Sequence, residues 1–131
     1  MNKKDYIGYD LAKHLQKKGF KGESEYYFFA ITDNEDNFIK HKIFKWLTKD
    51  KCPNIPTYSY YQIITELAEE LFGEASLVEV VCTCLYCKND TDIEDKAYIV
   101  FSKIILEMLQ SGKPQKEIDK YILNNLTDKY K

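Results

Sequence analysis

The residues from Asn54 to Lys88 read NIPTYSYYQIITELAEELFGEASLVEVVCTCLYCK. Thr57 is a good helix N-cap residue, and Ser59 with Gln62 offers an alternative capping box two residues later. Apolar side chains then recur at helical spacing, and Gly73 supplies a C-cap. This stretch therefore predicts an amphipathic helix that ends at Gly73.

The second half of the stretch, residues 76–87, predicts a β-strand. A period of two residues places one set of side chains on a single face: Val78, Val80, Cys82, Cys84 and Tyr86. The opposite face carries Glu79 and Thr83 but also Val81 and Leu85. Because that face is partly apolar, we expect it to be covered, either by a second copy of the chain or by the last helix.

Three of the four cysteines lie in this strand, and their spacing suggests a metal site. Cys84 and Cys87 have the spacing of a zinc knuckle, Cys82 lies beside them, and Cys52 can supply a fourth ligand. A knuckle needs a turn between its paired cysteines, whereas Leu85 and Tyr86 fit a strand. We therefore expect Cys82 and Cys84 to pack in the core. Cys87 faces the other way near the strand end, so it is the candidate for a reactive thiol.

The N-terminal part of the chain predicts a helix and a β-hairpin. Residues 8–18 place Leu11, Ala12 and Leu15 on one helical face, and Gly19 ends the helix. Residues 25–32 are apolar on both faces, which is typical of a central strand. Residues 33–37 form a polar turn. Residues 38–47 fit either a helix or an edge strand protected by lysines, and their position after a short turn favours the strand.

The rest of the chain predicts a connection over residues 48–57 and two C-terminal helices. The first begins at a capping box at Thr91–Glu94 and ends before Gly112, and its broad apolar surface suggests a central core helix. Pro114 begins the second. The order αββαβαα predicts a single α+β domain over residues 1–131, with a three-stranded antiparallel sheet and three to four helices.

Three short motifs resemble a family of small uncharacterised proteins encoded in phages and prophages of anaerobic gut bacteria. They are Lys18-Gly19-Phe20 after the first helix, Tyr26-Tyr27 in the first strand, and Pro56-Thr57-Tyr58 before the next helix. Family members usually carry Trp and Arg in that helix, and this chain has neither there. The resemblance implies an accessory role in a mobile element and brings no assigned activity.

Composition limits the possible partners. All nineteen basic residues are lysine, so no guanidinium can read guanine or clamp a phosphate bidentately. The net charge of −2 predicts no general attraction to nucleic acid or membranes. No apolar run has the length of a signal peptide or a membrane span. We therefore expect a cytoplasmic protein, with reduced cysteines and no membrane partner.

A basic strip over residues 40–51 nevertheless fits single-stranded nucleic acid. Lysines that can meet phosphates are interleaved here with rings that can stack on bases. The candidate residues are Lys40, Lys42, Lys45, Trp46 and Lys49. The alternative interpretation is an edge strand whose lysines prevent aggregation.

The hypothesis that the sequence favours is a non-enzymatic protein-interaction module of a phage or mobile element, which binds or inhibits a host factor. Its interface candidates are Tyr58, Tyr61, Val81 and Leu85, and it can form a homodimer. Neither His14 nor His41 has an evident catalytic partner, and no nucleotide loop or nucleophile elbow is present. We expect no catalytic residue and no cofactor. The alternatives are the single-stranded nucleic-acid protein and a small zinc protein.

Overall fold

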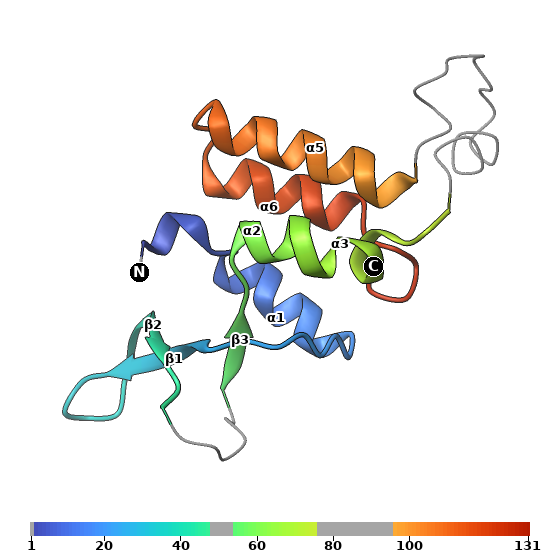
Figure 1. The fold of residues 1–131 in the computed structure, drawn as a ribbon. Coiled ribbons are helices and arrows are strands. Elements are labelled where there is room, and N and C mark those ends of the chain that lie inside the picture. Colours follow the sequence, from blue (N-terminus) through green and yellow to red (C-terminus); the bar gives the residue numbers. More distant parts are fainter. Residues whose placement is uncertain (1, 48–53, 76–95) are drawn as a thin grey trace. The chain divides into compact units, whose positions relative to one another are not determined.

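The computed structural model describes residues 2–47, 54–75 and 96–131 (Figure 1). The chain divides into two compact units, residues 1–60 and 61–131. A single domain over residues 1–131 stays a prediction. Together they confirm an α+β protein with a three-stranded antiparallel sheet. No helix in the described ranges is both long and apolar enough to cross a bilayer.

Among its described residues, the first unit contains the helix α1 and the whole described sheet. Its elements are the 3₁₀ turn η1 (Lys3–Asp5), α1 (Tyr9–Lys17), β1 (Tyr26–Thr32), β2 (Phe38–Lys45) and β3 (Ile55–Thr57). The strand order is β2-β1-β3, with β1 antiparallel to both neighbours. The prediction that residues 25–32 form a central strand is therefore confirmed, as is the choice of strand over helix for residues 38–47.

Local sequence signals locate α1 and the hairpin turn. Leu11, Ala12 and Leu15 are buried as predicted, and the chain leaves the helix through Gly19 at φ +85°. In the turn, the Asp33 carboxylate accepts the backbone N–H groups of Asn37 at 2.9 Å and Glu35 at 2.8 Å. These bonds favour the ionised carboxylate and lower the pKa of Asp33.

The third strand corrects the prediction of a plain connection over residues 48–57. Ile55–Thr57 pairs with residues 26–28 of β1 at an edge of the described sheet. Proline is tolerated at an edge, where its missing N–H costs no ladder bond, and this allows Pro56 to lie in the strand. The strand expected over residues 76–87 lies outside the described residues.

Thr57 is not the helix N-cap. Its hydroxyl donates instead to the carbonyl of Ile7 at 3.0 Å, and the backbone N–H of Ile7 donates to the carbonyl of Tyr58 at 3.0 Å. The helix begins at Tyr60, directly after Ser59, where the alternative capping box placed it. The hydrogen bond to Ile7, fifty residues away in sequence, thus engages the Thr57 hydroxyl that the sequence assigned to the helix cap.

The described part of the second unit consists of helices. A helical segment runs as α2 (Tyr60–Gln62), the π-helical turn η2 (Ile63–Leu67) and α3 (Ala68–Phe72), and ends at Gly73 with φ +83°. Two neighbouring helices follow, α5 (Ala97–Gln110) and α6 (Gln115–Asn124), which lie side by side in Figure 1. The Gly73 C-cap and the helix after Pro114 are as predicted.

Helix α5 is less buried than a central core helix. Only Ala97 and Ile105 are fully buried among its described residues, while Phe101 is half-buried between Phe72 and Tyr121. The helix packs on α3, η2 and α6. These contacts leave most of its apolar side chains only half-buried.

Candidate nucleic-acid interface

The register of the β1–β2 hairpin collects aromatic and basic side chains on one face of the sheet. Paired residues share a face, and Tyr27 is opposite Phe44, Phe29 is opposite Lys42, and Ile31 is opposite Lys40. The ring contacts of Trp46 place it on the same side. We call this surface the aromatic face, which consists of Tyr27, Phe29, Ile31, Lys40, Lys42, Phe44 and Trp46.

The four rings of the aromatic face form a connected row. Phe29 stacks on Trp46 with centroids 6.1 Å apart and an interplanar angle of 24°. Phe44 meets Phe29 edge-on at 5.7 Å, and Tyr27 meets Trp46 at 6.4 Å. Phe44 is 47% exposed, and the other three rings are half-buried. The rings therefore pack against one another and still leave surface that a planar ligand can contact.

The opposite face of the hairpin is the core side of this unit. Phe28 is buried and receives the Tyr9 ring edge-on at 5.5 Å. The Tyr9 ring also stacks on His41, with centroids 3.7 Å apart and an angle of 15°. His41 is thus part of a ring stack, and no described residue near it is a cysteine.

The structure separates the predicted nucleic-acid residues into two groups. Lys40, Lys42 and Trp46 belong to the aromatic face. Lys45 has the opposite parity, is paired with Tyr26, and its ammonium group lies 3.7 Å from the exposed Glu25 carboxylate. Lys49 lies outside the described residues.

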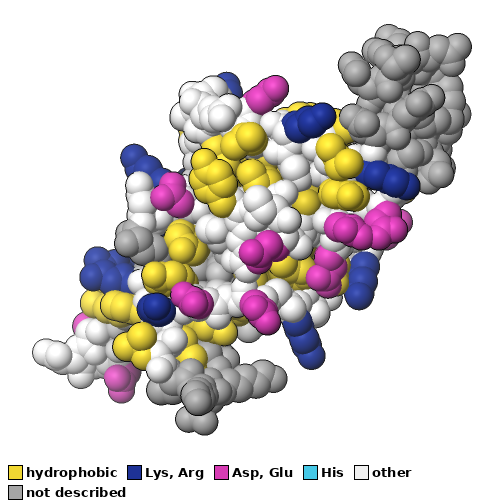
Figure 2. Space-filling view, in the orientation of Figure 1, with side chains coloured by type: hydrophobic (Ala, Val, Ile, Leu, Met, Phe, Trp, Pro, Cys, Tyr) yellow, Lys and Arg dark blue, Asp and Glu magenta, His cyan; other side chains and the backbone are white. Residues whose placement is uncertain are grey.

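A shallow basic hollow runs beside the exposed strand β2. It measures about 250 Å³ and is lined by Lys3, Lys40, His41, Lys42 and Ile43. In Figure 2, lysines and apolar side chains lie side by side over the hairpin, at the lower left of the view. Positive charge and apolar surface therefore meet at this strand.

Four members of the aromatic face are not among the residues predicted from the sequence: Tyr27, Phe29, Ile31 and Phe44. The pattern of residues 25–32 predicts a strand that is apolar and buried on both faces, which conceals its outward rings. The signal that could have found them is the short turn, because a hairpin closed at residues 33–37 sets which residues of the two strands are opposite one another.

Charge is divided unequally between the two units. Residues 1–60 contain eleven lysines and eight acidic residues, a net charge of +3. Residues 61–131 contain eight lysines and thirteen acidic residues, a net charge of −5. The total of −2 therefore conceals a basic unit, and that unit carries the aromatic face.

The predicted tyrosine interface is only partly at the surface. Tyr58 is 1% exposed and cannot anchor a partner, because its ring packs edge-on against Phe20 at 5.3 Å. Tyr61 is 61% exposed and is available. Val81 and Leu85 lie outside the described residues.

The zinc hypothesis concerns residues that the structure does not describe. Cys52, Cys82, Cys84 and Cys87 all lie in the two undescribed stretches. Within the described ranges, no three His, Cys, Asp or Glu side chains are grouped to hold a metal. The cysteine predictions stay predictions.

No protein-family model, curated protein or solved structure matches this chain. The resemblance to phage proteins therefore also stays a prediction. The geometry of the first unit is the basis for a functional proposal.

Proposed function

We propose that this protein binds single-stranded nucleic acid on the aromatic face of the β1–β2 hairpin. The observation that carries the proposal is the row of four contacting rings, with Lys40 and Lys42 on the same face. Single-strand binders combine these two elements, because every base has a face for stacking and every nucleotide has a charged phosphate.

The rings and the lysines have separate tasks. Bases stack on Phe44 and on the exposed parts of Phe29 and Trp46, and each such contact contributes about 1–3 kcal/mol when measured by alanine substitution. Lys40 and Lys42 neutralise phosphates. Because the chain has no arginine, binding is expected to discriminate little between sequences. The proposal is a binding role and includes no reaction.

The charge distribution supports the same proposal. The overall net charge of −2 argues against nucleic acid only if it is spread evenly. The first unit carries +3, and the basic hollow beside β2 adjoins the aromatic face. The unit that carries the proposed site thus has an excess of positive charge, which favours a polyanion.

Trp46 is the chain's only tryptophan and lies in the site, so it reports binding without a label. Titration with a short oligothymidylate should quench its fluorescence, and the apparent affinity should fall as salt rises. A control titration uses free tryptophan amide under the same conditions. Unchanged Trp46 emission at low salt, with no binding by anisotropy of a labelled oligonucleotide, would refute the proposal.

Protein interaction is a second candidate, supported by apolar side chains at the start of β2. Phe38 is 58% exposed and Ile39 is 56% exposed, on a strand at the edge of the described sheet. Such a surface suits a protein partner or a second copy of this chain. This candidate would be favoured if the protein binds no oligonucleotide and its apparent molecular mass rises with protein concentration, and if Ile39→Ser abolishes that rise. The predicted role in a mobile element would then rest on protein interaction.

A further inference from the structure

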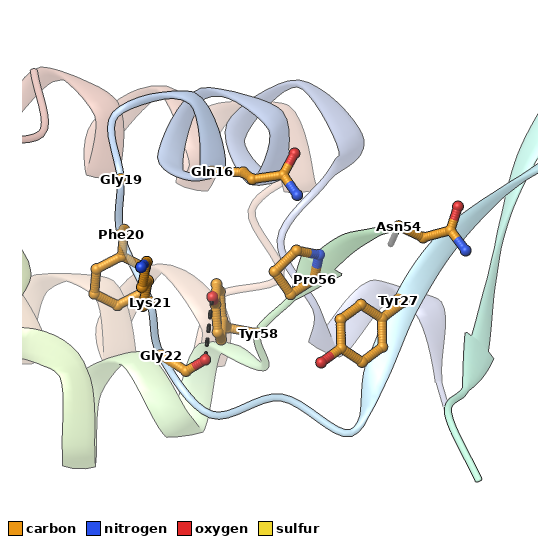
Figure 3. A pocket seen from close by; sticks show the side chains of 9 residues that line it. All are labelled: Gln16, Gly19, Phe20, Lys21, Gly22, Tyr27, Asn54, Pro56 and Tyr58. Carbon is orange, nitrogen blue, oxygen red and sulfur yellow. Dashed lines mark hydrogen bonds between the residues drawn. The ribbon is translucent and has the colours of Figure 1, made fainter. Parts of the chain in front are cut away.

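A pocket at the β3 edge of the sheet adjoins the aromatic face. It has a volume of about 310 Å³, and its principal lining residues are Gln16, Phe20, Lys21, Tyr27, Pro56 and Tyr58. Figure 3 shows the rings of Tyr27, Pro56 and Tyr58 around it, with the Gln16 amide extending from α1. We call it the β3 pocket. All of its lining residues belong to the first unit.

The inner wall of the β3 pocket is closely packed. Phe20 and Tyr58 are almost fully buried and pack edge-on at 5.3 Å. Gly22 allows this approach, since a Cβ there would lie 2.9 Å from the Tyr58 ring and 3.0 Å from the Phe20 ring. The Tyr58 hydroxyl reaches the Gly22 carbonyl at 3.5 Å. The wall is thus shaped before any ligand arrives, which lowers the entropic cost of binding.

The remaining lining of the pocket is polar in a manner suited to a nucleotide. Gln16 carries an amide, which offers both donors and an acceptor to the edge of a base, and Asn54 also lines the pocket. Lys21, which Figure 3 shows beside Phe20, adds a cation to the lining. The half-buried ring of Tyr27, the Gln16 amide and the Lys21 cation correspond to the base face, base edge and phosphate of a nucleotide.

Tyr27 joins the pocket to the aromatic face. It is paired with Pro56 on one side and with Phe44 on the other, and its ring lies 6.4 Å from Trp46. A strand that stacks on Trp46 can therefore continue past Tyr27 into the pocket. The volume is at the lower end of the range of about 300–1,000 Å³ for small-molecule sites, which suits one base.

We propose that the β3 pocket takes one unpaired nucleobase of the strand bound on the aromatic face. The inference rests on the proposed function and adds a site with a defined occupant. It also explains why residues of three separate motifs, Gly19-Phe20, Tyr27 and Pro56 with Tyr58, meet around a single space.

Two measurements on the full chain test the pocket. Thymidine 5′-monophosphate should shift the NMR signals of the Gln16 and Asn54 side-chain amides and of the Gly22 backbone amide. Gln16→Ala should weaken oligothymidylate binding roughly three- to tenfold, the effect of losing one neutral hydrogen bond. The matched control is Gln110→Ala, an exposed glutamine at the end of α5, which should change nothing.

Oligonucleotides with an abasic nucleotide at each position in turn identify the base that enters the pocket. One position should weaken binding to the native protein, and the same position should have little further effect in Gln16→Ala. Quenching of Trp46 without nucleotide-induced shifts, and with equal affinities of Gln16→Ala and Gln110→Ala, would overturn the pocket and leave the proposed function intact.

Other outcomes overturn both or point to another ligand. If neither oligonucleotide nor nucleotide binds, the pocket inference and the proposed function both fail. If thymidine 5′-monophosphate causes no NMR shifts but N-acetylphenylalanine amide shifts the same signals, the pocket binds a protein side chain instead. Nucleotide-induced shifts without any response of Trp46 to oligonucleotides would separate the pocket from the aromatic face and contradict the continuous path.

Discussion

At the scale of single residues, the position of a lysine along β2 decides which face of the sheet it lies on. Lys40 and Lys42 share a face with the rings, whereas Lys45 lies on the other face beside Glu25. All three are exposed and equal in charge. Their spacing in sequence sets this difference once residues 38–45 form a strand, because successive side chains of a strand alternate between its two faces.

The first prediction compares these lysines. Lys40→Gln and Lys42→Gln should each weaken oligothymidylate binding and reduce the slope of log affinity against log salt by about 0.7, the value for one phosphate contact on a single strand. Lys45→Gln removes the same charge from the same strand and should leave the slope unchanged. Equal slopes for all three variants would show that only the general charge matters.

The second prediction concerns the close approach at Gly22. Gly22→Ala should lower the free energy of unfolding by about 1–3 kcal/mol, because the added methyl group meets two buried rings. Lys21→Ala, at the exposed neighbour, should stay within about 0.5 kcal/mol of the native chain. Urea denaturation followed by circular dichroism measures both. A neutral Gly22→Ala would mean that the Phe20–Tyr58 wall yields easily.

Among the secondary-structure elements, the two faces of the hairpin divide structure from proposed binding. One face carries Phe28 and the Tyr9–His41 stack and belongs to the core of its unit. The other carries the aromatic row. Strand β2 holds two exposed phenylalanines that lie apart from each other, since Phe44 contacts Phe29 and Phe38 contacts His41.

The third prediction uses these two phenylalanines as a matched pair. Phe44→Leu should weaken oligothymidylate binding by about 1 kcal/mol or more, because leucine keeps apolar area but cannot stack on a base. Phe38→Leu makes the same change at a residue of similar exposure outside the row and should have little effect. Loss of binding in Phe38→Leu alone would move the site to the other end of β2.

Across the whole molecule, contacts distant in sequence close each unit. In the second unit, the backbone N–H of Thr127 donates to the carbonyl of Leu71 at 2.8 Å, and the Tyr130 hydroxyl donates to the Glu70 carboxylate at 2.6 Å. Tyr130 is 1% exposed. Burial, and then the bond to Glu70, raise the pKa of Tyr130.

The fourth prediction follows from that pKa. The ordinary tyrosine pKa is about 10, and a higher pKa in the folded state means that folding favours the neutral phenol. Its contribution to stability is complete below about pH 10 and is lost as pH rises through the folded pKa. Tyr130→Phe should lower the free energy of unfolding by about 1 kcal/mol at neutral pH. On going to alkaline pH, the variant should lose less stability than the native chain.

Denaturation at neutral and alkaline pH measures this difference. Tyr61→Phe, at an exposed tyrosine, serves as the control and should follow the native chain at both pH values. Other phenols such as Tyr121 also have a raised pKa, so the comparison depends on the difference between variant and native chain. If Tyr130→Phe loses as much stability at alkaline pH as the native chain does, Tyr130 is not the source of that loss.

Elements whose signals are local could be located from the sequence. The ends of α1 and α3 follow from Gly19 and Gly73, which adopt positive φ without strain. The hairpin follows from the polar turn, where Asp33 binds backbone groups two and four residues away. Such interactions span a few residues, so the pattern of residue types is sufficient to locate them.

By contrast, β3, the aromatic face and the β3 pocket emerge only in the folded chain. Thr57 acts in the sheet because its hydroxyl finds Ile7 fifty residues away. Trp46 joins Tyr27 and Phe29 because of pairing register, and Tyr58 is lost as an interface residue because Phe20 covers it. Each depends on partners distant in the chain, and a strand sequence alone does not say which neighbour lies opposite or which face stays uncovered.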